Sequence, residues 1–173
     1  MSTKNEKLMV APCGLSCGHC RLHLAKDDPA MREWLRTNGF NPESYPCAGC
    51  RTLDGKVSCS KPAFEAPKVD GRCATYACVV EHGVDFCYEC QEFPCAKLQP
   101  CADKARELPH NMKVFYLTYI QKYGLTKFLA DYPGLGMKYY FGTMVVGLGP
   151  QLSANDLADI RAKLGTDTGA NKA

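Results

Sequence analysis

Three cysteines within nine residues could supply most of a metal site. Cys87 and Cys90 form a Cys-x2-Cys pair, and Cys95 follows immediately after Pro94. Thiolate sulfur is a favoured ligand of zinc, and zinc usually takes four ligands in a tetrahedral arrangement. The segment therefore predicts three ligands of one metal ion, with the fourth ligand coming from elsewhere in the chain.

Two more groups of closely spaced cysteines lie upstream and could complete such sites. Cys13, Cys17 and Cys20 follow the spacing Cys-x3-Cys-x2-Cys, and Cys47 with Cys50 forms a second Cys-x2-Cys pair. Glycines inside the first group permit the tight backbone that directs several thiolates at one point, and the second group is typical of a zinc knuckle. Both groups are therefore predicted to bind metal.

A third pair has a spacing that constrains its local structure. Cys73 and Cys78 are five residues apart, and on a helix the two thiols would point about 140° from each other. They can bind one ion only if Cys73 precedes the helix that carries Cys78. That helix would then end near Glu81, with Gly83 as its left-handed stop.

Three histidines lie near these cysteines and offer nitrogen ligands. His19 and His23 flank or follow Cys20, which opens a short predicted helix, and His82 is four residues after Cys78. With so many thiols available, we expect His19 and His23 to be helix-surface histidines. His82 stays a weaker alternative ligand.

The cysteine count and the lack of targeting signals point to metal rather than disulfides. The chain has twelve cysteines in 173 residues, its first ten residues are polar and charged, and no apolar run reaches the roughly 20 residues of a membrane helix. We therefore expect a cytoplasmic protein, in which thiols stay reduced. The predicted ligands of two or three Zn²⁺ ions are Cys13, Cys17, Cys20, Cys47, Cys50, Cys59, Cys73, Cys78, Cys87, Cys90, Cys95 and Cys101. Cys59 and Cys101 have no close partner in sequence and could instead be reactive thiols.

Apolar periodicity predicts helices between and after the cysteine groups. Asp28-Pro29 begins a helix that ends at Asn38-Gly39, and its repeat places the only tryptophan, Trp34, toward the core. Pro94 can start a helix through Leu98. A further helix is predicted from Pro100 to Leu108. The next helix is capped by Asn111, and its predicted core stripe is Met112, Phe115, Tyr116, Tyr119, Ile120 and Tyr123. After it we expect a short helix from Leu125 to Asp131, a turn at Tyr132-Pro133-Gly134, either a strand pair or a helix-loop over Met137 to Gly149, and a final helix after Ser153 that buries Leu157, Ile160 and Leu164.

These elements predict a mainly α fold with small irregular or β zinc-knuckle elements. We expect a cysteine-rich metal-binding region at residues 8–102 and a helical C-terminal region at residues 103–173. The two regions are expected to pack as one compact unit.

The net charge changes sign once metal is included. The formal charge is +3 at pH 7 with every cysteine neutral, but a Zn(Cys)4 centre adds about −2, so two or three such sites make the protein slightly negative. The sequence also lacks a basic stripe. We therefore do not expect nucleic acid as a partner.

The order of the motifs is similar to that of a known family. The landmarks are Cys13-Gly-Leu-x-Cys17-x2-Cys20, Cys47-x-Gly49-Cys50-Arg51, Cys73-x4-Cys78 and Cys87-x2-Cys90-x3-Pro94-Cys95. This series resembles DUF3795, an uncharacterised family of bacteria and archaea, over about residues 12–100. The resemblance implies metal, in particular zinc, and no established reaction. Where the family usually has a Cys-x2-Cys before the Cys-x4-Cys pair, this chain has Cys59 followed by thirteen residues.

The leading hypothesis is a zinc protein whose sites are mainly structural and which binds an unknown protein or small-molecule partner. No carboxylate pair, Ser/His/Asp set or phosphate loop stands out, so we lean against an enzyme; the oligomeric state is open. One alternative is an iron–sulfur protein, since Cys13, Cys17 and Cys20 have the spacing by which radical-SAM enzymes hold a [4Fe–4S] cluster. Another is a thiol-redox protein that releases its metal on oxidation.

Overall fold

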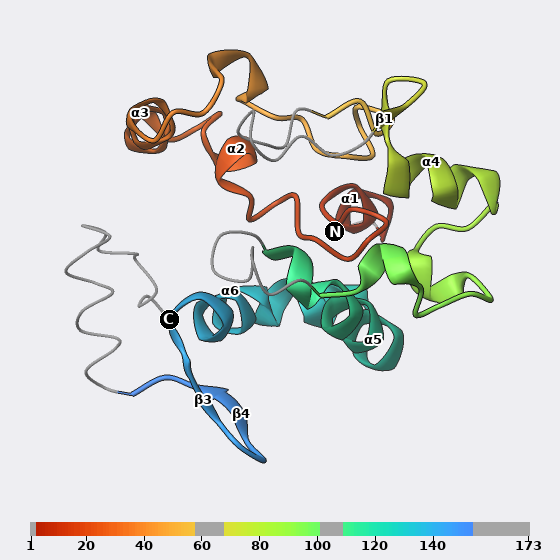
Figure 1. Cartoon of the computed structure of the whole chain (residues 1–173). Helices are drawn as coiled ribbons and strands as arrows, with labels where there is room; N and C mark the ends of the chain where they lie inside the picture. Colours follow the sequence, from red (N-terminus) through yellow and green to blue (C-terminus); the bar gives the residue numbers. More distant parts are fainter. Residues whose placement is uncertain (1–2, 58–67, 101–108, 154–173) are drawn as a thin grey trace. The chain divides into compact units, whose positions relative to one another are not determined.

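The computed structural model describes residues 3–57, 68–100 and 109–153 (Figure 1). The chain divides into two compact units, Met1–Ala130 and Asp131–Ala173. Helices dominate, which confirms the predicted mainly α fold, while the predicted division at residues 102 and 103 stays a prediction. None of the helices within the described ranges has the length and apolar character needed to span a membrane.

The first part of unit 1 contains short helices on either side of the early cysteines. These are α1 (Thr3–Leu8), α2 (Arg21–Leu24), α3 (Pro29–Thr37) and the 3-10 turn η1 (Pro42–Ser44). The predicted start of α3 is confirmed, because the Asp28 side chain accepts a hydrogen bond from the Met31 N–H at 3.0 Å. Its end is confirmed too, with Asn38 as the C-cap.

The prediction that Trp34 faces the core is wrong. Leu35 is completely buried against Leu22 and Ala25, whereas Trp34 is 38% exposed. Successive residues on a helix turn by about 100°, so a face centred on Leu35 leaves Trp34 at the rim. There the indole ring lies 4.1 Å from the Arg21 guanidinium carbon, a cation–π contact.

The middle of unit 1 holds the elements that carry the later cysteines. They are the antiparallel pair β1 (Lys68–Val69) and β2 (Arg72–Cys73), helix α4 (Ala74–Glu81), and the 3-10 turns η3 (Cys87–Glu89) and η4 (Ala96–Leu98). The predicted placement of Cys73 just before a helix that ends at Glu81 is confirmed, and Gly83 has a φ of +63°. The predicted helix from Pro94 is wrong, because Cys95 has extended backbone angles and only one 3-10 turn follows.

Helix α5 (Lys113–Tyr123) provides much of the buried surface of unit 1 and follows the 3-10 turn η5 (Pro109–Met112). Asn111 lies inside that turn, so the prediction that it caps the helix is wrong. The buried residues are Tyr116, Leu117 and Ile120, while Phe115 is 47% exposed. The predicted stripe is therefore rotated toward Leu117, which puts Phe115 on the outer side.

Helix α6 (Leu125–Phe141) begins in unit 1 and continues into unit 2. The prediction of a short helix that ends at Asp131 and a turn at Tyr132-Pro133-Gly134 is wrong, since the helix continues through Pro133. Proline removes one helical hydrogen bond, which can kink a helix without ending it. In unit 1, Phe128 of this helix is fully buried and packs edge-on against Tyr116, with ring centroids 5.3 Å apart.

The described part of unit 2 ends in a β-hairpin. Strands β3 (Thr143–Val145) and β4 (Gly149–Gln151) pair in antiparallel register, which resolves the open choice over Met137 to Gly149 into a helix end followed by a strand pair. A Cβ on Gly142 would lie 2.4 Å from the Lys138 carbonyl oxygen, so this sharp exit from the helix needs glycine. The predicted helices from Pro100 and after Ser153 lie outside the described residues.

Candidate metal centres

Ten of the predicted ligand cysteines fall in described parts of the chain, and none of these ten forms a disulfide. Cys59 and Cys101 lie outside the described residues. We define two groups. The thiol cluster is Cys13, Cys17, Cys20, Cys47 and Cys50. The mixed cluster is Cys78, His82, Cys87, Cys90, Glu92 and Cys95.

The first loop of the thiol cluster folds back on itself immediately after α1. The Ala11 N–H donates to the Leu15 carbonyl at 2.8 Å, and the Gly18 N–H donates to the Met9 carbonyl at 3.1 Å. These bonds turn the backbone so that Cys13 and Cys17 lie on one compact loop.

Gly14 lets this loop pack directly on α5. A Cβ at this position would lie 3.0 Å from Leu117 Cγ and 3.3 Å from the Lys113 carbonyl oxygen. Its φ of +87° also lies in the left-handed region that favours glycine. The loop that carries Cys13 and Cys17 is thereby placed against helix α5.

The second loop of the thiol cluster is attached to α2 by its backbone. The Cys47 N–H donates to the Leu22 carbonyl at 2.8 Å, and His23 Nδ1 donates to the Cys47 carbonyl at 2.7 Å. His23 is only 8% exposed, so the expectation of a helix-surface histidine is wrong for this residue. Its side chain turns inward because the Cys47 carbonyl offers it a partner.

The sulfur of Cys17 lies at the centre of this cluster. Its Sγ accepts a hydrogen bond from the Cys50 N–H at 3.4 Å. Burial raises the pKa of the Cys17 thiol to about 11, the Cys50 N–H lowers it, and the neighbouring thiols Cys13, Cys20 and Cys47 raise it further. Thiols gathered where their negative charges would repel one another match the donor set that a bound dication stabilises.

Arg51 connects three segments that are far apart in the chain. Its Nε donates to the Val10 carbonyl at 2.9 Å and its Nη2 donates to the Asp85 carbonyl at 2.6 Å. The guanidinium carbon also lies 4.7 Å from the centroid of the Phe86 ring. The motif assigns no role to Arg51, but the structure makes it the link between the two cysteine loops and the segment before Cys87.

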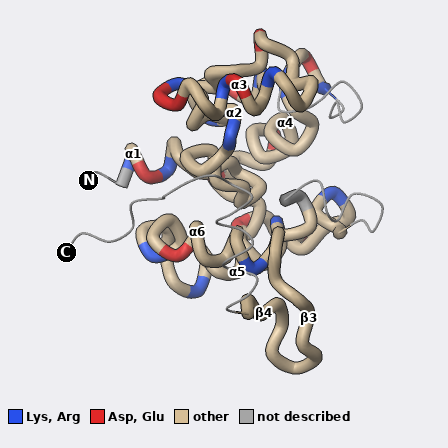
Figure 2. Tube along the Cα trace, turned by 90° about the vertical axis from the view of Figure 1, so that its left-hand side faces the viewer, with Lys and Arg blue, Asp and Glu red and all other residues tan. Residues whose placement is uncertain are grey.

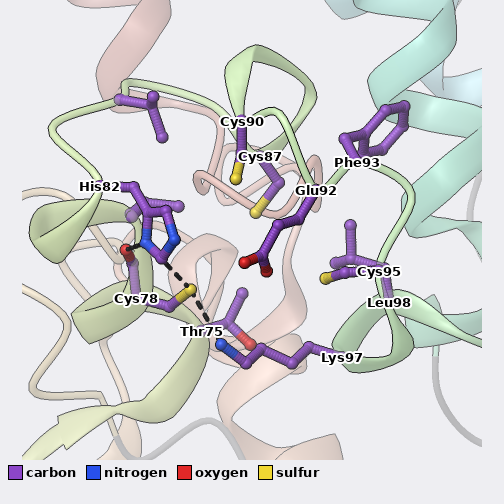
Figure 3. A pocket seen from close by; sticks show the side chains of 12 residues that line it. Thr75, Cys78, His82, Cys87, Cys90, Glu92, Phe93, Cys95, Lys97 and Leu98 are labelled. Carbon is purple, nitrogen blue, oxygen red and sulfur yellow. Dashed lines mark hydrogen bonds between the residues drawn. The ribbon is translucent and has the colours of Figure 1, made fainter.

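The mixed cluster lines a pocket formed by α4, η3 and the turns that follow (Figure 3). The Cys87 N–H donates to the Pro12 carbonyl at 3.0 Å, which places Cys87 beside the first cysteine loop. Burial raises the pKa of the Cys87 thiol to about 12, and Cys13, Cys95 and Cys78 raise it further. Cys13, a member of the thiol cluster, thus also lies next to the mixed cluster.

Next to Cys87, the mixed cluster contains a histidine and a glutamate in addition to thiols. One ligand atom each from His82, Cys90 and Glu92 lies within 4.8 Å of the others. Within the described ranges, no three thiols reach this spacing, so an ion bound by the thiol cluster would draw its sulfur atoms together. Glu92 was not a predicted ligand, although its position two residues after Cys90 is a signal that the sequence contains.

Lys97 and Cys73 each make a hydrogen bond near the predicted sites. Lys97 Nζ donates to Cys78 Sγ at 3.1 Å, and this bond raises the pKa of the Lys97 ammonium group. Cys73 lies in β2, where its N–H donates to the Gly55 carbonyl at 2.9 Å. The structure therefore brings nine of the predicted cysteines into the two clusters and leaves the role of Cys73 as a prediction.

Among the residues that the structure describes, basic side chains near these sites pair with acidic ones. Figure 2 shows basic and acidic positions mixed along α3, and Lys and Asp residues mixed along α6. Of the charged groups near the clusters, Lys7 pairs with Asp85 and Arg72 pairs with Asp54.

A family model described as a protein of unknown function, DUF3795, matches residues 9–100. The matched range includes both clusters. No curated protein and no solved structure matches the chain.

Proposed function

The chain belongs to the DUF3795 family, and we propose that it is a zinc-binding protein whose metal ions are mainly structural. The thiol cluster would hold one ion through Cys17, Cys20, Cys47 and Cys50. The thiols of Cys13, Cys78, Cys87 and Cys95 would supply a second four-thiolate set.

One observation carries the proposal: thiols from two separate loops surround Cys17. Cys47 is 30 positions away from Cys17 in the printed sequence, yet both thiols are close enough to influence one pKa. An ion shared by these thiols would hold the two loops together. Structural zinc of this kind contributes on the order of 10 kcal/mol to folding.

The chemistry of the donors supports zinc over a hard metal ion. Soft thiolates favour zinc, copper(I) and iron–sulfur clusters, whereas calcium and magnesium prefer oxygen ligands. Zinc has no redox chemistry, so its contribution in a four-thiolate site is to fix loop geometry. The protein would then work by binding a protein or small-molecule partner on the surface that the ions hold in place.

The decisive experiment is metal analysis of the full chain as purified from cells. We expect two or three zinc atoms per chain by elemental mass spectrometry. Removal of the zinc by a strong chelator should abolish cooperative thermal unfolding, followed by circular dichroism, and added Zn²⁺ should restore it.

Two results would contradict this function. A brown protein that contains iron and absorbs near ~400 nm after anaerobic purification would favour the iron–sulfur alternative. A colourless protein without metal, whose unfolding transition is unaffected by the chelator, would exclude structural metal of any kind.

A further inference from the structure

We propose that His82, Cys90 and Glu92 bind a divalent transition-metal ion of their own and leave one coordination position for an exogenous ligand. The basis is that their three ligand atoms lie within 4.8 Å of one another and border one pocket. The inference concerns a site separate from the two four-thiolate sets and does not depend on them.

His82 is oriented as a metal-binding histidine would be. It is the C-cap residue of α4, and its Nδ1 donates to the Cys78 carbonyl at 2.8 Å. Metal-binding histidines commonly use one ring nitrogen in this way, which fixes the tautomer and leaves the other nitrogen with its lone pair for the ion. Here the remaining nitrogen is Nε2, on the side of the ring that faces Glu92 (Figure 3).

Cys90 and Glu92 reach the same point because they share one turn. Cys90 is the C-cap residue of η3, and the Phe93 N–H donates to the Cys90 carbonyl at 3.1 Å. This bond turns the backbone at Gln91 and Glu92 so that the carboxylate points into the pocket between Cys90 and Cys95 (Figure 3). Helix α4 and this turn thus supply the three ligands from two separate elements.

The ligand set differs in kind from four thiolates. One imidazole, one thiolate and one carboxylate balance the charge of a dication, and three protein ligands are typical of zinc sites that keep a position for water or substrate. His82 and Glu92 are both exposed. An ion here would therefore be in contact with solvent rather than enclosed.

The open position would face space large enough for a small molecule. The adjoining pocket has a volume of about 300 Å³ and is lined by His82, Val84, Glu89, Cys90, Gln91 and Glu92. This volume is at the lower end of the range for small-molecule sites. We infer that the exchangeable ligand is water or a small anion with a nitrogen, oxygen or sulfur donor.

The test compares metal content in H82Q and E92Q with that of the wild type, in the full chain. Each variant should bind one ion fewer per chain by native and elemental mass spectrometry. Glu81 is an exposed neighbour on α4 that lies outside the mixed cluster, so E81Q should keep the full count. Unchanged circular dichroism establishes that a variant is folded, and a folded variant pair with wild-type metal content overturns the site.

The open position is tested with Co²⁺ in place of the native ion. Thiocyanate should change the visible absorption of the wild-type cobalt protein and leave that of folded E92Q unchanged. No change in the wild type overturns the open position. A protein that binds a single ion in a His82-dependent manner would support this site while contradicting structural zinc in the thiol cluster, and the opposite pattern would do the reverse.

Discussion

The thiol cluster and the mixed cluster start from the same Cys-x2-Cys spacing and differ in what surrounds it. In the thiol cluster, the neighbours of Cys17 are thiols from its own loop and from a loop 30 positions later in the sequence. In the mixed cluster the pair divides: Cys87 is influenced by Cys13, Cys95 and Cys78, whereas Cys90 lies beside His82 and Glu92. Spacing therefore predicts candidate ligands without predicting which of them lie together.

The histidines beside the two clusters differ in burial. His23, next to the thiol cluster, is 8% exposed and uses its Nδ1 on a backbone carbonyl of the cysteine loop. His82 makes a similar bond to a carbonyl but stays exposed, with its ring beside an open pocket. We expect the thiol cluster to respond to mutation mainly through folding, and the site of His82, Cys90 and Glu92 mainly through metal content.

The largest expected effect is that of Cys17→Ser. Removal of the central thiolate should release the ion of the thiol cluster, and with it folding free energy on the order of 10 kcal/mol. We expect a largely unfolded chain by circular dichroism and hydrogen exchange. Thr37→Ala, a change of an exposed hydroxyl on α3, is the control and should unfold like the wild type. A folded C17S variant that keeps its zinc would contradict the expectation that mutation of the thiol cluster acts through folding.

The next largest effect is on the pH dependence of metal binding. The pKa of Cys17 is about 11 and that of Cys87 about 12, so both thiols are protonated at neutral pH without metal. Each must lose a proton when an ion binds. The affinity for the metal ion should therefore fall as the pH falls, by about tenfold per pH unit for every thiol proton that the ion displaces.

A four-thiolate set releases up to four thiol protons when it binds an ion and should lose up to about 10⁴-fold in affinity per pH unit. The site of His82, Cys90 and Glu92 contains a single thiol, so its affinity should depend less steeply on pH. Titration with zinc at several pH values, with proton release measured in buffers of different ionisation enthalpy, separates the two. Equal pH slopes would show that the two regions bind metal with the same number of thiolates.

Arg51→Ala should have an intermediate effect, on folding alone. The change removes two charge-assisted hydrogen bonds to backbone carbonyls, at 2.9 and 2.6 Å, each of about 1.5–3 kcal/mol. We expect the free energy of unfolding in urea to fall by about 3–5 kcal/mol. Arg51→Lys keeps the charge but loses the planar fork and should recover only part of the loss. Full recovery by lysine would mean that Arg51 acts through its charge and not through its geometry.

Sequence patterns predicted the parts of this protein that depend on local rules. Asp28-Pro29 and Asn38 bound α3 because capping involves only neighbouring backbone groups, and Cys73 precedes α4 because helical geometry required it. The prediction was wrong where distant contacts decide. Trp34 lies at the rim because Leu35 occupies the core, and α6 continues through Pro133.

The candidate sites were predictable to a similar degree. Cysteine spacing pointed to the nine cysteines that lie in the two clusters, since closely spaced cysteines share a local turn. The roles of Arg51 and Glu92 depend on segments that are joined only in three dimensions: Val10 and Asp85 for the first residue, His82 for the second. A carboxylate next to a cysteine pair predicts a ligand only when the element that packs against it, here the end of α4 with His82, is known.

The smallest effect that we predict tests whether packing on α5 stabilises the first loop of the thiol cluster. Gly14→Ala forces a Cβ to within 3.0 Å of Leu117 Cγ at a φ of +87°, so it should lower the free energy of unfolding by about 2–4 kcal/mol through strain and overpacking. Gly39→Ala is the matched control, because its φ is +73° but no atom lies within 4 Å of the added Cβ, and it should cost only the strain, about 1 kcal/mol. Urea unfolding of the zinc-loaded chain measures both. If the two changes lower the free energy of unfolding equally, packing on α5 does not stabilise the first cysteine loop. If Gly14→Ala lowers it more and also lowers the affinity for zinc, packing on α5 and metal binding in the thiol cluster are coupled, as a structural metal site requires.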